Sequence, residues 1–97
     1  MNPSIEKAIA RHEIKGTLEE LIGTISYLLP TKGRCYLIYP ATRMVDLIEG
    51  LRNEKVEPKR LQLVYPSLDK EAKFVLIEAI KSSGVTLEVI PPQVLPK

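Results

Sequence analysis

The chain of 97 residues contains no tryptophan, one cysteine and one histidine. The single cysteine, Cys35, has no partner for an internal disulfide, and one cysteine with one histidine is too few for a zinc cluster. No apolar run approaches the ~20 residues that a membrane-spanning helix needs. The first residues lack the basic segment and apolar stretch of a secretory signal. These absences predict a cytoplasmic protein that makes no membrane contact.

The charge of the chain is nearly balanced, which limits the classes of partner. The 14 Lys and Arg residues against 12 Asp and Glu residues give a net charge of +2. A dedicated RNA-binding arm carries a far stronger basic excess, so this balance permits contact with nucleic acid without predicting it. A content of 44% hydrophobic and 27% charged residues is typical of a globular chain. The length fits one domain over residues 1–97, without a linker or an internal repeat.

No motif indicates catalysis, cofactor binding or metal binding. The 5 glycines are too scattered for a phosphate-binding loop, and no serine has the surroundings of a nucleophile elbow. Cys35 begins the apolar run of residues 35–39, which predicts a buried and unreactive thiol. We therefore expect no catalytic residue, no cofactor-binding residue and no metal ligand in this chain.

Two groups of polar residues are candidate contacts for a substrate or for RNA. Arg11, His12 and Glu13 form the densest polar cluster, which fits either a phosphate contact or an ordinary solvated helix end. The second group is basic and lies near the ends of the expected helices and strands. It consists of Arg34, Arg43, Lys59 and Arg60, of which the last three are taken as candidate contacts. Ordinary exposed surface is the alternative interpretation of this group.

Capping residues and periodicity predict two helices in the first third of the chain. A short helix is expected over residues 3–13, with Asn2 as its N-cap. Thr17 and Glu20 then form a capping box, and apolar residues follow at helical spacing. This pattern predicts a second helix over residues 18–29.

Strands and a further helix are expected after this point. Residues 34–39 are short, apolar and rich in strand formers, which predicts a strand buried on both faces. Thr42 is expected to cap a helix over residues 43–53. Further strands are expected over residues 61–65 and 85–90, and the tail after them is expected to be extended.

The segment over residues 72–81 is ambiguous when its residues are considered alone. Its apolar residues fit an amphipathic helix closed by Gly84, and this is the assignment that periodicity favours. Residues 74–77 are a continuous apolar run, however, which also fits a buried strand.

Several short motifs resemble, in order and spacing, the C-terminal half of class I S-adenosylmethionine-dependent methyltransferases. The similarity is greatest to the "methyltransferase small" family that modifies the exocyclic amine of an adenine in valine-accepting tRNA. It extends over nearly the whole chain. The motifs are Ala10-Arg11-His12-Glu13, Thr17-Leu18-Glu19-Glu20-Leu21, Leu28-Leu29-Pro30, Lys32-Gly33-Arg34, Arg43-Met44-Val45-Asp46-Leu47-Ile48, Glu57-Pro58-Lys59-Arg60-Leu61, Val75-Leu76-Ile77-Glu78-Ala79 and Pro91-Pro92.

The resemblance implies an α/β fold that is the C-terminal half of a Rossmann-like methyltransferase sheet. It implies a mixed sheet of three to four strands with two to three helices. In that family the last strand inserts antiparallel between its two neighbours, which makes residues 72–81 a strand rather than a helix. The cluster Arg11, His12 and Glu13 would follow the family's catalytic loop.

The resemblance also implies that this chain is inactive alone. The family's glycine-rich cofactor loop, its acidic ribose contact and its Asn-Pro-Pro-Tyr motif do not occur here, and Asn2-Pro3 does not replace that motif. We therefore expect a C-terminal fragment of an RNA adenine-N6 methyltransferase that binds no S-adenosylmethionine by itself. The alternatives are a non-enzymatic self-associating module and a small tRNA-binding domain.

The expected partners follow from the same comparison. The strand in this chain that would pair with the family's missing fourth strand has an open edge over residues 35–39. We expect a homodimer through this edge, an N-terminal methyltransferase half as a further partner, and tRNA as an additional candidate. The alternative to the homodimer is a monomer in which the helix expected over residues 3–13 lies across this edge.

Overall fold

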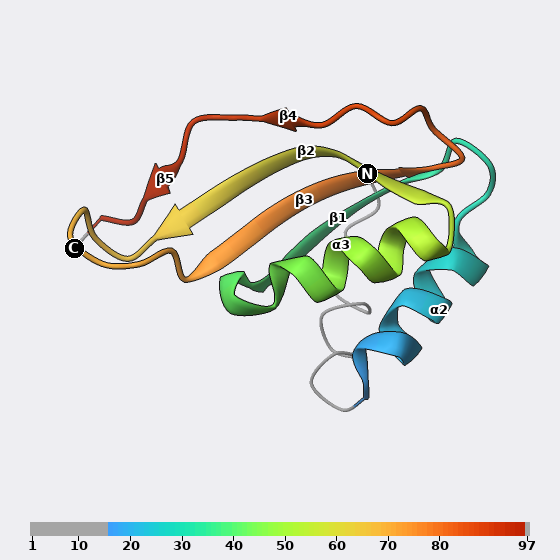
Figure 1. Cartoon of the computed structure of the whole chain (residues 1–97), viewed down its shortest axis with the longest axis horizontal. Coiled ribbons are helices and arrows are strands. Elements are labelled where there is room, and N and C mark those ends of the chain that lie inside the picture. The colour runs from blue at the N-terminus through green and yellow to red at the C-terminus, as the bar shows by residue number, and fades with distance from the viewer. Residues whose placement is uncertain (1–15, 97) are drawn as a thin grey trace.

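The computed structural model describes residues 16–96 (Figure 1). The helix expected over residues 3–13 and the cluster Arg11, His12 and Glu13 lie outside the described residues. The described elements, in chain order, are α2 (Leu18–Leu28), β1 (Arg34–Pro40), the 3-10 turn η1 (Ala41–Arg43), α3 (Met44–Asn53), β2 (Val56–Tyr65), β3 (Phe74–Lys81), β4 (Glu88–Val89) and β5 (Gln93–Val94).

The strands form one mixed sheet in the order β1-β3-β2-β4, and β5 also pairs with β2. β3 is antiparallel to both β1 and β2, with Ile77 opposite Leu37 on one side and Leu61 on the other. β4 and β5 run parallel to β2 along its far edge. The assignment of residues 72–81 to an inserted antiparallel strand is therefore confirmed, and the helix that periodicity favours is wrong.

The sheet has five strands, one more than the upper limit expected from the sequence. The additional strand is β5, in the tail after Pro91-Pro92 that was expected to be only extended. The Leu95 amide donates to the Tyr65 carbonyl at 2.9 Å, which holds this tail on the end of β2. The strand expected over residues 85–90 is shorter, because only Glu88–Val89 pair with β2.

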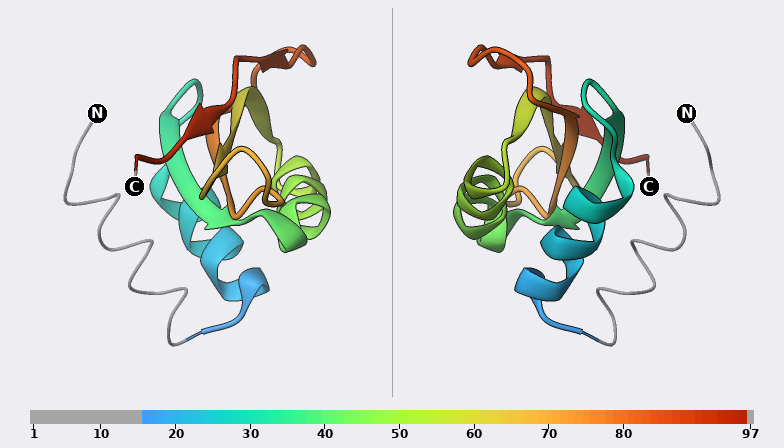
Figure 2. Two further views of the ribbon diagram at one scale, coloured as in Figure 1. Left: turned by 90° about the vertical axis from the view of Figure 1, so that its left-hand side faces the viewer. Right: turned by 90° about the vertical axis from the view of Figure 1, so that its right-hand side faces the viewer.

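Both helices pack on the same side of the sheet (Figure 2). Leu21 and Ile25 of α2 and Leu47 of α3 belong to one buried apolar cluster, together with Leu37 of β1 and Ile77 of β3. Because strand side chains alternate between faces, only every second residue of β1 and β3 reaches this core. The fold is α/β, as expected.

The start of α2 agrees with the capping-box prediction. The Glu20 amide donates to Thr17 Oγ1 at 3.1 Å, and the Thr17 amide donates to Glu20 Oε1 at 2.9 Å. These two bonds satisfy amides that have no partner within the helix. The helix ends at Leu28, one residue before the expected end, and Pro30 follows.

The start of α3 differs from its prediction. Thr42 does not cap the helix, because it lies within the turn η1 that precedes α3. The N-cap position is occupied by Arg43, whose side chain makes no capping hydrogen bond. The Ala41 amide donates to the Lys73 carbonyl at 3.0 Å. This bond ties the end of β1 to the start of β3 and directs the chain into a tight turn before α3 begins.

The prediction that β1 is buried on both faces is wrong. Cys35, Leu37 and Tyr39 are buried, but Ile38 is 61% exposed and Arg34 is also exposed. The helices cover one face of the sheet only, so the alternate residues of β1 remain open to solvent.

The core role of α2 can be tested by truncating its buried side chains. Leu21 is 1% and Ile25 0% exposed, so replacing either by Ala should lower the free energy of unfolding by about 2–4 kcal/mol. Tyr27→Ala is the matched control on the same helix, because Tyr27 is 88% exposed, and it should change stability by less than about 0.5 kcal/mol. Urea unfolding followed by circular dichroism measures all three. Small losses at both Leu21 and Ile25 would contradict the helix orientation.

Candidate functional site

The face of the sheet opposite the helices carries an open groove of about 470 Å³. Its floor is made by β1, β3 and β2, and Ile90 lies at its margin. Most of the side chains that line it are apolar, and a few polar groups come from the middle of the strands. The side chains that face this groove include Tyr36, Ile38, Leu76, Glu78, Gln62 and Ile90.

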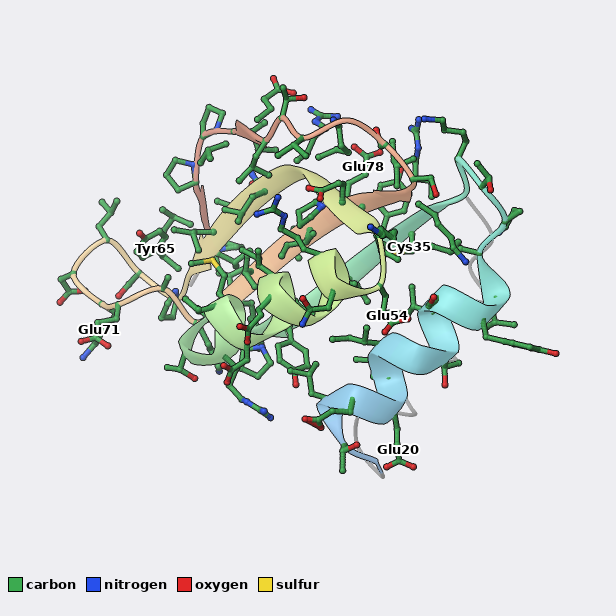
Figure 3. The ribbon with its side chains drawn as sticks, turned by 45° about the vertical axis from the view of Figure 1, so that its right-hand side comes forward. Glu20, Cys35, Glu54, Tyr65, Glu71 and Glu78 are labelled. Carbon is green, nitrogen blue, oxygen red and sulfur yellow. The ribbon has the colours of Figure 1, made fainter. Side chains whose placement is uncertain are left out.

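A buried carboxylate lies in the middle of this open face. Glu78 is on β3, directly between Tyr36 of β1 and Arg60 of β2 in the strand register. Its side chain is only 10% exposed, and Oε2 accepts from Arg34 Nη1 at 3.1 Å. Figure 3 shows Glu78 on the side of the sheet that faces away from the helices. Sequence reasoning missed this residue, and the only signal was one charge within the apolar run of residues 74–80.

The Arg34 guanidinium keeps its charge beside this carboxylate. A hydrogen bond with Tyr36 and the negative charge of Glu78 raise the pKa of Arg34 above its ordinary value. The two side chains form an ion pair that joins β1 to β3 across the open face. A buried carboxylate needs such a partner because burying an unpaired charge is costly. The ion pair can order β1 against β3.

Arg43 lies on the other side of the sheet. Its guanidinium carbon is 5.8 Å from the centroid of the Tyr39 ring, within the range of a cation–π contact. Arg43 also lines a groove of about 410 Å³ between α2 and α3, together with Glu19 and Asp46. Arg43 is the last residue of η1 and directly precedes α3, which agrees with the expected position near a helix end, and acidic side chains line the same groove.

Lys59 and Arg60 both hold the segment that contains β4 against β2. The Lys59 ammonium donates to the Gly84 carbonyl at 2.7 Å and to Thr86 Oγ1 at 2.9 Å. Arg60 Nε lies 3.4 Å from Glu88 Oε1. The structure thus brings these two candidate residues together and leaves Arg43 apart from them. Both engaged side chains have a structural role that their position in the sequence did not indicate.

The carboxyl ends of β1 and β2 lie at the same edge of the sheet, where open α/β sheets bind ligands. Pro40 and Ala41 come at the end of β1, and Pro66 and Ser67 follow β2. Neither turn contains the glycines that let a backbone approach a nucleotide closely. The described residues at this edge therefore do not fit a nucleotide-type cofactor by themselves.

Between residues 16 and 96, His, Cys, Asp and Glu side chains form no group of three or more that could hold a metal ion. Over the same part of the chain, no helix is both long and apolar enough to cross a membrane.

Cys35 is buried against the helices, as the sequence predicts. Burial raises the pKa of its thiol from the ordinary 9.0 to about 11, because the charged thiolate loses its hydration. A thiol in this state is a poor nucleophile at neutral pH.

The raised pKa of Cys35 predicts a loss of stability at alkaline pH. The unfolded chain releases the thiol proton near pH 9 and the folded chain only near pH 11. Stability from this group is therefore complete below pH 9 and is lost as the pH rises to 11, by about 2–3 kcal/mol. Urea unfolding from pH 8 to 11 should show a steeper decline for the natural chain than for Cys35→Ala. Parallel declines in the two proteins would contradict a buried neutral thiol.

The role of Lys59 can be tested by hydrogen exchange. Lys59→Met removes both bonds to residues 84–86, so the segment with β4 should open more often. The Ile90 amide, which donates to the Leu61 carbonyl at 2.9 Å, should then exchange faster than in the natural chain. Lys70→Met is the control, because Lys70 is exposed in the loop between β2 and β3. Equal exchange of Ile90 in the two variants would argue against the proposed role.

The chain is similar to part of a known methyltransferase. No family model matches it. The tRNA1(Val) (adenine(37)-N6)-methyltransferase of Parabacteroides distasonis is 32% identical over an alignment of 94 residues that covers 90% of this chain and 40% of that protein.

A solved structure supports the fold independently. It is described as a predicted O-methyltransferase from Agrobacterium tumefaciens, and it matches with a TM-score of 0.71 at 24% identity. The match covers 82% of this chain and 38% of that chain. The chain thus spans less than half the length of both proteins. In sequence the chain is thus similar to part of a longer tRNA methyltransferase, and it shares its fold with part of a predicted O-methyltransferase.

Proposed function

We propose that this chain is the C-terminal part of an S-adenosylmethionine-dependent methyltransferase that acts on an adenine amine in tRNA, and that it has no activity alone. The observation that carries the proposal is the 32% identity over 90% of the chain to a tRNA adenine-N6 methyltransferase. The fold supports it, because the match to a second methyltransferase covers a similar share of that protein.

The open features of the sheet are consistent with this function. Among the described residues, β1 pairs with β3 only, so its other edge has no strand beside it. The groove on the face opposite the helices is likewise uncovered by any described helix. A polypeptide corresponding to the rest of the relative would supply the missing strand and helices. This chain would then complete the sheet of the methyltransferase and form one wall of its active site.

The cofactor would be held outside the described residues. When bound, S-adenosylmethionine supplies the methyl group, and the turns after β1 and β2 lack the glycines that such a cofactor requires. The contribution of this chain is the rigid sheet against which the rest of the enzyme packs. A cytoplasmic location follows from the proposed action on tRNA.

RNA contacts are proposed for a smaller set of residues than the sequence suggested. Lys59 donates hydrogen bonds to Gly84 and Thr86, and Arg60 forms an ion pair with Glu88. These two residues are therefore weaker candidates for RNA contact than the sequence alone indicates. Arg43, at the carboxyl end of β1, remains a candidate together with Arg11, His12 and Glu13. Loss of RNA affinity with rising salt would accompany any such contact.

The proposed function predicts activity only when the missing region is present. A fusion in which this chain replaces the C-terminal 40% of the Parabacteroides protein should transfer methyl groups to an unmodified valine tRNA. The truncated relative and this chain alone serve as controls, and neither should be active. Calorimetry should detect S-adenosylmethionine binding to the fusion and not to this chain.

Two results would contradict the proposal. One is methyl transfer or cofactor binding by this chain alone. The other is a fusion that binds S-adenosylmethionine and is folded by circular dichroism, yet transfers no methyl group to tRNA. The first result would show that the chain contains its own cofactor site, and the second that it does not replace the relative's C-terminal region.

A further inference from the structure

β1 has an inner edge that pairs with β3 and an outer edge that pairs with no described strand. The hydrogen bonds on the inner edge show which residues of β1 direct their backbone amide and carbonyl groups to the outer edge. The Lys81 amide donates to the Gly33 carbonyl at 2.9 Å, and the Ala41 amide donates to the Lys73 carbonyl at 3.0 Å. In an antiparallel ladder the amide and carbonyl of one residue point the same way, and successive residues alternate. The odd-numbered residues of β1 therefore bond to β3.

The even-numbered residues of β1 consequently point their backbone groups away from the sheet. Arg34, Tyr36 and Ile38 each present an amide and a carbonyl on this side, and Pro40 presents a carbonyl. No described strand pairs with this edge. An unpaired row of this kind is a template for another strand.

This edge has little of the protection that exposed edges usually carry. Natural edges are blocked by lysines, inward charges, prolines or bulges. On β1 the only proline is the last residue, Pro40, and the only charge is Arg34, which is paired with Glu78. The bulge of the sheet lies in β2, between Pro58 and Arg60. Ile38, in the second half of the strand, is 61% exposed.

The sequence of β1 is complementary to itself when two copies run antiparallel. A two-fold axis at Leu37 places Tyr36 opposite the partner's Ile38 and makes this a hydrogen-bonded pair, since both residues point outward. Aromatic and β-branched residues are a favourable cross-strand pair. The axis also places Arg34 opposite the partner's Pro40.

Charge favours the same arrangement. The two Arg34 residues lie at opposite ends of the paired strands, about 20 Å apart at ~3.4 Å per residue, which exceeds the screening length at physiological salt. No like charges face each other across the axis. The apolar grooves beside Tyr36 and Ile38 in the two copies would become continuous on one face of the joined sheet.

We propose that the outer edge of β1 is a pairing surface for β1 of a second copy of this chain. The result is a two-fold dimer with one continuous sheet. The inference concerns the chain alone and does not depend on methyltransferase activity. The missing region of a methyltransferase would occupy the same edge, so the two partners exclude each other.

The mass of the chain in solution gives the first test. Sedimentation equilibrium at micromolar concentration should give about twice the 10.9 kDa of one chain. Ile38→Lys places a charge on the edge and should return the mass to that of one chain. Val45→Lys is the matched control, because Val45 is 74% exposed on α3, and it should leave the doubled mass unchanged.

Hydrogen exchange gives the second test, because it reports which edge is used. In the natural chain the Tyr36 and Ile38 amides should be protected, and dilution or Ile38→Lys should increase exchange at Tyr36 at least tenfold. The Leu37 amide should stay protected in both proteins, which also shows that the variant is folded.

Three results would overturn the proposal. The first is a single-chain mass at micromolar concentration. The second is a doubled mass with rapid exchange at Tyr36 and Ile38, which would place the interface elsewhere. The third is a doubled mass that Ile38→Lys does not change. None of these results bears on the fusion assay, so failure of this proposal and failure of the proposed function are distinguishable.

Discussion

The structure depends on β3, which is hydrogen-bonded to β1 along one edge and to β2 along the other. Because β3 is antiparallel to both, β1 and β2 are parallel to each other and end at the same edge of the sheet. Val75, Ile77 and Ala79 point toward the helices and are buried, so the same strand forms the centre of the core. The other face of β3 carries Glu78, around which the polar groups of the open face are arranged.

The sequence predicted best the elements that are stabilised by residues close together in the chain, and α2 is the clearest case. Its capping box and apolar spacing act within the helix, so they could be read from Thr17, Glu20 and Leu21 without knowledge of the rest of the chain. β3 could not be assigned in this way, because its apolar run satisfies a helical pattern equally well. Only the family resemblance identified it as a strand. Thr42 shows the opposite failure, since a good capping residue lies within the turn η1 and Arg43 occupies the N-cap position instead.

The polar contacts were beyond sequence reasoning because they join residues that are far apart in the chain. Arg34 and Glu78 are 44 positions apart, and Lys59 is 25 positions from Gly84. Their pairing is set by the order of strands in the sheet and not by any local spacing. Lys59 and Arg60 therefore looked like free basic residues, whereas both secure the segment that contains β4. The expectation that β1 is covered on both faces failed for a related reason, since both described helices lie on one side.

The central claim is that this chain has the strand order of a methyltransferase C-terminal region, with β3 between β1 and β2. Nuclear Overhauser contacts between backbone Hα protons test it most directly, because opposed residues in antiparallel strands bring these protons close. The account predicts contacts between Tyr36 and Glu78 and between Leu61 and Ile77. Direct contacts between β1 and β2, or the short-range pattern of a helix over residues 74–81, would contradict it.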